Sequence, residues 1–149
     1  MKIIVDADAC PVVIKEILFK AAARTRVTLI LIANHAMKIP PSPTIHFVQV
    51  MSGFDVADDE IVQRTEKNDL IVTSDIPLAA EVIEKEGLVL SPRGEVFDKQ
   101  NIKSRLTTRD FMETMRASGE HTGGPPPMSH RERKEFAGHL DKLLSQYNK

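Results

Sequence analysis

Short apolar stretches alternate with stretches of helical periodicity over residues 1–90. Five stretches rich in Val, Ile and Leu predict strands at residues 2–5, 27–32, 45–50, 70–75 and 88–90. Between them, apolar positions at helical spacing predict helices that begin at Pro11, at Asp55 (to about 66) and at Pro77 (to about 86). This alternation predicts an α/β fold, in which helices cover both faces of a parallel sheet.

The chain after residue 90 follows a different pattern. Residues 91–102 predict a loop with a short extended piece at 95–97, and residues 101–106 predict one or two helical turns. Thr107 and Asp110 have capping-box spacing, which predicts a helix through residue 115, and residues 122–128 ("TGGPPPM") predict a loop. Ser129 and Glu132 form a second capping box, which begins a final helix with an apolar stripe of Phe136, Leu140, Leu143, Leu144 and Tyr147. We expect a single domain over residues 1–149, with a helical extension from about residue 101.

The composition narrows the class of protein. A chain of 149 residues that is 42% hydrophobic can bury a core without the help of a disulfide or a metal. Cys10 is the only cysteine, which excludes an intramolecular disulfide and a cysteine-rich zinc site and favours a reducing cytoplasm. No apolar run approaches the ~20 residues of a membrane helix, and the first residues do not resemble a secretory signal. We therefore expect a cytoplasmic protein that does not enter a membrane.

The charge is unevenly distributed. The net charge is −1, but residues 1–90 carry 9 Lys/Arg and 13 Asp/Glu, whereas residues 91–149 carry 11 and 8. An acidic body followed by a basic section is compatible with a metal centre beside a phosphate-binding surface, but chance variation in surface charge is the favoured explanation of the asymmetry alone.

Carboxylates end two of the predicted strands. Asp6 and Asp75 should lie at the same edge of a parallel sheet, where its carboxyl ends meet. Asp55, Asp58 and Asp59 are spaced so that they share one face of the helix between those strands. Two carboxylates 4 Å apart repel by about 4 kcal/mol at an effective dielectric of 20, and a cation between them would relieve this repulsion.

Oxygen ligands of this kind favour Mg²⁺ or Mn²⁺ over zinc. The sequence therefore predicts a divalent-metal site formed by Asp6, Asp75 and either Asp58 or Asp59, with Asp8 and Asp55 as further candidate ligands. Such ions commonly serve phosphoryl chemistry, which makes the acids at positions 6, 58, 59 and 75 the candidate catalytic residues.

Simpler explanations exist for some of these residues. Asp is a favoured helix N-cap, so Asp55 and Asp75 could each cap a helix, and Asp59 could be a solvated surface charge. Asp6 has no such explanation, because it follows an apolar strand. Cys10, with no histidine partner in the pattern, is interpreted as a small buried apolar residue rather than a nucleophile.

Five segments in this order, "DADACP", "GFDVADDEIV", "TSDIPLA", "RGEVF" and "GGPPP", closely resemble the YaiI/YqxD family of bacterial proteins over nearly the whole chain. That family is regarded as PIN-like. The resemblance implies a three-layer α/β/α sandwich with a mostly parallel sheet, whose edge acids bind Mg²⁺ or Mn²⁺ for the cleavage of RNA or DNA. The PIN acid after the first strand corresponds to Asp6 and less closely to Asp8, the helix acid to Asp58 or Asp59, and the "T-x-D" acid to Asp75. "RGEVF" and "GGPPP" lie outside the usual PIN pattern.

Basic residues after position 90 are the candidates for phosphate contact: Arg93, Lys99, Lys103, Arg105 and Arg109. The alternative is a solvated helix face paired with nearby acids. Only 5% of the residues are aromatic, so any nucleic-acid binding should depend on phosphates and show little sequence preference.

The expected function is metal-dependent cleavage of phosphodiester bonds in single-stranded RNA or DNA. Two alternatives stay open. One is a non-catalytic module that binds nucleic acid or protein and retains the acidic site. The other is a metal-dependent phosphatase for a small substrate.

Overall fold

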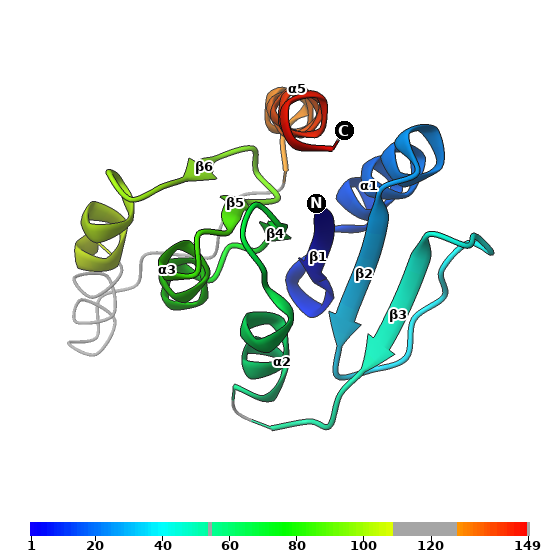
Figure 1. Cartoon of the computed structure of the whole chain (residues 1–149), viewed down its shortest axis with the longest axis horizontal. Coiled ribbons are helices and arrows are strands. Elements are labelled where there is room, and N and C mark those ends of the chain that lie inside the picture. Colours follow the sequence, from blue (N-terminus) through cyan, green and yellow to red (C-terminus); the bar gives the residue numbers. More distant parts are fainter. Residues whose placement is uncertain (54, 109–127, 149) are drawn as a thin grey trace.

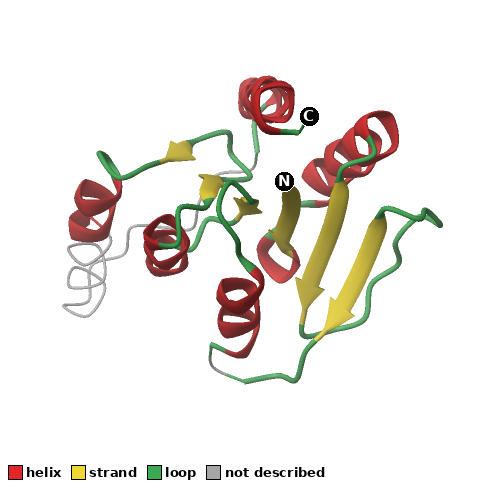
Figure 2. Ribbon diagram, viewed as in Figure 1, coloured by secondary structure: helices red, strands yellow, loops and turns green. Residues whose placement is uncertain are grey.

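A mostly parallel sheet lies at the centre of the computed structural model, which describes residues 1–53, 55–108 and 128–148 (Figures 1 and 2). Within these residues the sheet has six strands in the order β3-β2-β1-β4-β5-β6, and only the β5–β6 pair is antiparallel. The strands are β1 (Lys2–Asp6), β2 (Thr28–Ala33), β3 (Ile45–Gln49), β4 (Leu70–Val72), β5 (Leu88–Leu90) and β6 (Val96–Phe97).

The helices cover both faces of this sheet. They are η1, a 3₁₀ turn (Ala7–Ala9), α1 (Val12–Thr25), α2 (Val56–Arg64), α3 (Ile76–Glu84) and α5 (His130–Tyr147); residues 102–108 are also helical. Alternate side chains of a strand point to opposite faces. Accordingly, Val5 shares one apolar cluster with Leu18 of α1 and Phe136 of α5, whereas Ile4 shares the other with Ile61 of α2. The result is a three-layer α/β/α arrangement, as the sequence predicted.

The order of the strands reverses between β1 and β4. From β1 the chain adds β2 and β3 on one side, and then crosses through α2 to place β4 on the other side of β1. The carboxyl ends of β1 and β4 are therefore neighbours, with their following segments leaving in opposite directions. Ligands of open α/β sheets bind at such a position.

The predicted elements are confirmed for residues 1–90, with shifts at their ends. The strand predicted over residues 70–75 ends at Val72, because Thr73 and Asp75 form the turn that leads into α3. The helix predicted from Asp55 to about residue 66 runs over Val56–Arg64. No helix of the described residues is long and apolar enough to cross a membrane.

Of the two predicted capping boxes, one is confirmed and one is wrong. Ser129 Oγ accepts a hydrogen bond from the Glu132 N–H at 3.1 Å, and Glu132 Oε1 accepts one from the Ser129 N–H at 3.0 Å. Thr107 begins no new helix, because it lies inside the helix of residues 102–108 and donates its hydroxyl hydrogen to the Lys103 carbonyl. The predictions for residues 109–127 lie outside the described residues.

Candidate functional site

Asp6 and Asp75 are connected through the buried hydroxyl of Thr73. Val5 of β1 pairs with Val72 of β4, so Asp6 and Thr73 follow side by side at the carboxyl ends of the two strands. Thr73 Oγ1 donates a hydrogen bond to Asp6 Oδ2 at 3.0 Å and accepts one from the Asp75 N–H at 3.0 Å. Only 1% of Thr73 is exposed. The hydroxyl therefore holds the first acid at a fixed position beside the start of α3.

Asp75 is the N-cap of α3, as the simpler explanation predicted. Its Oδ1 accepts a hydrogen bond from the Leu78 N–H at 3.0 Å. Capping uses one carboxylate oxygen, so the cap fixes the side chain and leaves Oδ2 for another contact. Asp55 occupies the N-cap position of α2 with φ of 63°, but its side chain forms no capping hydrogen bond.

Asp58 is the acid of α2 that lies close to both strand-end acids. Partial burial, followed by the charges of Asp75, Asp6, Asp55 and Asp59, raises its pKa to about 6. Asp59 is exposed. Of the two acids that the sequence could not separate, Asp58 therefore belongs to the group at the sheet edge.

The neighbouring negative charges also affect Asp6. Burial is the largest cause that raises its pKa, and the nearby charges of Asp75 and Asp8 act in the same direction. The hydrogen bond from Thr73 opposes them, because it stabilises the ionised carboxylate. Asp6, Asp58 and Asp75 thus form a group of mutually repelling carboxylates, which we call the acidic triad.

Asp8 is bound by the loop that follows β2. Its Oδ2 accepts a hydrogen bond from the Asn34 N–H at 2.8 Å, and its Oδ1 lies 3.2 Å from Nε2 of His35. Both oxygens therefore contact protein groups. In this structure Asp8 attaches the η1 turn to the neighbouring loop and adds to the negative charge around Asp6.

An acidic cavity of about 370 Å³ lies between α2 and α3. Asp55, Asp58 and Asp59 line it from α2 and the residue before it, Glu81 lines it from α3, and Leu106 of the 102–108 helix contributes an apolar wall. All three aspartates line this cavity, Asp58 and Asp59 from α2 and Asp55 from the position before it.

The acidic triad has the chemistry of a hard-cation site. Where the structure describes the chain, Asp6 Oδ1, Asp75 Oδ2 and both oxygens of Asp58 accept no hydrogen bond. Carboxylate oxygens are the preferred ligands of Mg²⁺ and Mn²⁺, and a cation would offset the repulsion that raises the pKa of Asp58. Within the described residues, however, no three acidic, histidine or cysteine side chains are already grouped closely enough to hold an ion.

Comparison with known proteins identifies the family. The family model described as "Uncharacterized BCR, YaiI/YqxD family" matches residues 4–146. The chain belongs to the YaiI/YqxD family.

Relatives in this family match along the whole chain. A UPF0178 protein of Colwellia psychrerythraea is 68% identical over 149 residues, which cover 100% of this chain and 99% of the relative. UPF0178 proteins of Pseudoalteromonas translucida and Hydrogenovibrio crunogenus are 63% and 58% identical over 147 residues, with 98% and 99% of this chain and 97% of each relative covered. No solved structure matches the chain significantly. These similarities establish the family and leave the reaction to be inferred from the site.

The "RGEVF" segment of this YaiI/YqxD protein contacts the N-terminal part of α5. Arg93 Nη1 donates to both carboxylate oxygens of Glu132, at 3.1 and 3.0 Å. The Ser129 N–H and Arg93 together lower the pKa of Glu132. Gly94 has φ of 91°, and a Cβ added there would lie 2.8 Å from Glu135 Cβ and 2.9 Å from the Phe136 nitrogen. The segment therefore needs glycine where it meets the helix.

The other predicted basic residues are also not gathered at the acidic cavity. Arg105 forms an ion pair with Glu95, Lys99 lines a separate cavity beside Lys67, and Lys103 is exposed. None of the described members of this set lines the acidic cavity. Arg109 lies outside the described residues.

Several residues of the site were not found from the sequence. Thr73 could have been suspected from its position. It directly follows the apolar residues of β4, as Asp6 directly follows those of β1. Asn34 directly follows β2 at the same edge of the sheet. This position could have indicated its contact with Asp8. Cys10 is as interpreted: it is 6% exposed in the core, and burial raises the pKa of its thiol to about 12.

Proposed function

We propose that this YaiI/YqxD protein is a PIN-like nuclease that hydrolyses phosphodiester bonds in single-stranded RNA or DNA and depends on Mg²⁺ or Mn²⁺. One observation carries the proposal. Asp6, Asp58 and Asp75 come from the end of β1, from α2 and from the start of α3, and where the strand order reverses they lie close enough for their charges to raise the pKa of Asp6 and Asp58. A fold gains no stability from gathering like charges in a partly buried place, so their convergence favours a ligand of opposite charge.

Each acid of the triad is held by a different part of the fold. Asp6 is oriented by Thr73, Asp75 by the first turn of α3, and Asp58 by the packing of α2 on the sheet. When bound, the divalent ion supplies positive charge to the phosphate and lowers the pKa of an attacking water. The role of the three carboxylates is to bind that ion, and their orienting bonds limit the rearrangement that binding requires.

Asp58 connects ion binding to pH. Its raised pKa means that in the ion-free protein it takes up a proton at a pH only slightly below neutral. A carboxyl group must lose this proton to act as a ligand. The apparent affinity for the ion should therefore rise as the pH increases through about 6.

A metal-dependent phosphatase for a small substrate is the second candidate. The cavity beside Asp58 measures about 370 Å³, which lies within the ~300–1,000 Å³ that small-molecule sites occupy. The basic residues predicted to contact phosphates do not form a surface that continues from this cavity. A binding module without turnover is the third candidate, because the same acids could hold an ion without catalysis.

Incubation with labelled single strands distinguishes the three. We expect 5′-labelled RNA or DNA of mixed sequence to be cut with Mn²⁺ or Mg²⁺ and to remain intact in EDTA. Asp75→Asn should reduce the rate by at least about 100-fold, whereas Glu84→Gln, an exposed change elsewhere on α3, should leave it unchanged. Release of phosphate from p-nitrophenyl phosphate or nucleoside monophosphates, without strand cleavage, would favour the phosphatase. Strand binding without either reaction would favour the binding module.

A further inference from the structure

Helices α1 and α5 lie side by side and run in the same direction. Residues 13–20 of α1 and 130–137 of α5 line one groove, among them Val13, Lys20 and His130. The second halves line another cavity, with Arg24 on α1 and Asn148 after α5. The pair therefore has two ends with different surroundings, and the charges at the two ends differ.

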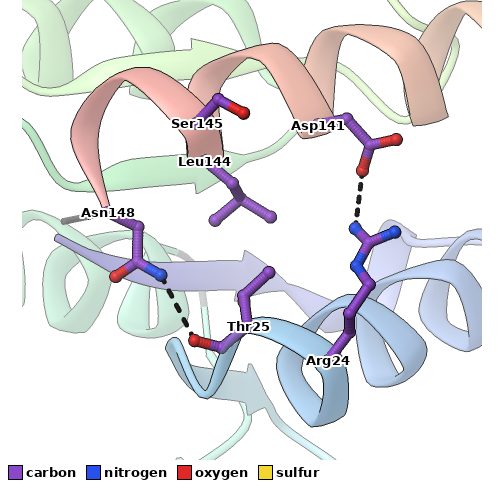
Figure 3. Close-up of a pocket in the computed structure, with 6 residues that line it drawn as sticks. All are labelled: Arg24, Thr25, Asp141, Leu144, Ser145 and Asn148. Atoms are coloured by element: carbon purple, nitrogen blue, oxygen red, sulfur yellow. Dashed lines mark hydrogen bonds and ion pairs between the residues drawn. The ribbon is translucent and has the colours of Figure 1, made fainter.

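The Arg24, Asp141 and Asn148 side chains of the cavity at the C-terminal end are engaged in contacts within the protein. Figure 3 shows Arg24 and Asp141 facing each other across the two helices, at 2.7 Å, and Asn148 reaching the Thr25 carbonyl at 3.5 Å. The one arginine that lines this cavity is thus already paired with an acid. The polar residues of this cavity therefore serve to join α5 to α1.

The groove at the N-terminal end has unpaired positive charge. It measures about 280 Å³, and Lys20, Arg133 and Lys134 line it together with one acid, Glu16. Among the described residues, neither Lys20 nor Lys134 makes an ion pair. We call this surface the basic groove; Val13, Ile17 and Ala137 are its apolar lining residues.

Arg133 gives an independent indication of a ligand. Its Nε is buried and has no hydrogen-bond partner in the part of the chain that the structure describes. Its guanidinium makes one long contact, from Nη2 to Nδ1 of His130 at 3.4 Å. A buried donor without an acceptor is unfavourable, and among the described residues Arg133 makes no ion pair, so none of their acids neutralises this cation of the groove.

One end of the basic groove, at Val13 and His130, is at the same edge of the sheet as the acidic triad. Helix α1 follows β1 through the η1 turn, so its N-terminus lies at the carboxyl edge where Asp6 lies. Because α5 is parallel to α1, the positive ends of both helix dipoles point to this edge. The short segment from Asp6 to Val13 joins the triad on one face of the sheet to the groove on the other.

We propose that the basic groove binds the phosphate backbone of a single-stranded nucleic acid whose cleaved bond lies at the acidic triad; the proposal rests on the nuclease function above. The groove lies between two helices. Such a groove accommodates a single nucleic-acid strand better than a flat surface would. The only large apolar side chains exposed among the described residues are Val12 and Met51. A lipid bilayer would therefore find few anchors here, whereas phosphates need only the cations.

Binding measured without cleavage tests the proposal separately from the nuclease function. The probe is a fluorescent single-stranded oligonucleotide of mixed sequence, titrated in EDTA at several salt concentrations with the Asp75→Asn protein. In that background, Lys20→Ala with Lys134→Ala should weaken binding by roughly threefold for each lost contact. The slope of log K against log salt should fall by about 1.4, since each single-strand phosphate contact contributes about 0.7. Arg133→Gln should also weaken binding, while keeping most of the side-chain volume.

A matched variant and a second ligand decide the outcome. Lys142→Ala removes an exposed lysine of α5 outside the groove and should change neither affinity nor slope. Selective loss in the groove variants supports the proposal even if no strand is ever cut. Wild-type affinity and slope in those variants would overturn it even if cleavage is observed, and so would failure of the intact groove to bind the oligonucleotide. A loss confined to binding of vesicles that contain phosphatidylserine would overturn it in favour of a membrane surface.

Discussion

The hydroxyl of Thr73 donates a hydrogen bond to Asp6 across the boundary between β4 and β1, at a separation of 3.0 Å. The two residues are 67 positions apart in the chain. Thr73 partly offsets the burial and the neighbouring charges that raise the pKa of Asp6. The stability of the candidate site therefore depends on an uncharged residue as well as on its acids.

Thr73→Val should destabilise the protein by about 1–3 kcal/mol near neutral pH, because it leaves a buried carboxylate without its donor while keeping the side-chain shape. Urea unfolding monitored by circular dichroism measures the change. Thr73→Ser retains the hydroxyl and should restore most of the loss. The destabilisation should shrink at low pH, where Asp6 is protonated. Equal stability of the Val variant and the wild type would show that the hydrogen bond has no energetic role.

Removing the charge of Asp58 should stabilise the ion-free protein at neutral pH. Its pKa is about 6 in the folded state, against an ordinary value of 3.8. Between these values the folded protein binds more protons than the unfolded chain, so the free energy of unfolding falls as the pH rises. Relative to wild type, Asp58→Asn should therefore gain on the order of 1 kcal/mol between pH 4 and pH 7, after allowance for solvent screening.

Melting temperatures in EDTA across this pH range test that prediction. Glu84→Gln is the control, since it removes an exposed charge that is not among the causes of the raised Asp58 pKa. A constant difference between Asp58→Asn and wild type at every pH would contradict the proposed repulsion.

Mn²⁺ or Mg²⁺ should raise the melting temperature of the wild type. An ion that binds only the folded state stabilises it by about 2.7 kcal/mol at 100 times its dissociation constant. Asp6→Asn should lose most of this gain, and Glu84→Gln should keep it. Differential scanning fluorimetry at increasing ion concentrations, at pH 5.5 and pH 7.5, also tests the expected pH dependence. Identical melting curves with and without millimolar ion would argue against the acidic triad as a cation site.

Two glycines should respond in opposite ways to the same substitution. Gly94→Ala should destabilise by about 1–3 kcal/mol, because its φ of 91° and its contact with the start of α5 leave no room for a side chain. Gly138→Ala should stabilise by about 0.5–1 kcal/mol, because a Cβ there meets nothing within 4 Å and alanine favours the helix. Urea unfolding of both variants measures the contrast. A neutral Gly94 variant would mean that the "RGEVF" segment can move away from α5.

The positions of Asp6 and Asp75 could be predicted because one rule of parallel sheets places the carboxyl ends of their strands at one edge. The choice of Asp58 over Asp59 could not, since it depends on how α2 rotates against the sheet. Thr73 was missed for a related reason: its contact with Asp6 requires the register between β1 and β4, which no local pattern contains.

The contacts of the basic residues were also not predictable from the sequence, because they join residues far apart in the chain. Arg93 was selected as an arginine in a loop, but its carboxylate partner, Glu132, is 39 residues away. The capping preference of Thr107 was equally misleading, because the preceding helix continues through it. Lys20, Arg133 and Lys134 were not singled out, because they come from opposite ends of the chain and become one surface only when α1 and α5 pack together.

Helix α5 comes from the end of the chain, yet its Phe136, Leu140 and Leu144 belong to the same apolar cluster as Ile3 and Val5 of the first strand. During synthesis the sheet and α1 are therefore made before α5, and part of one apolar face stays uncovered until α5 has emerged from the ribosome. Domains that bury such distant segments against each other complete their folding late. Loss of α5 from Leu140 onward would therefore leave this apolar cluster incompletely covered.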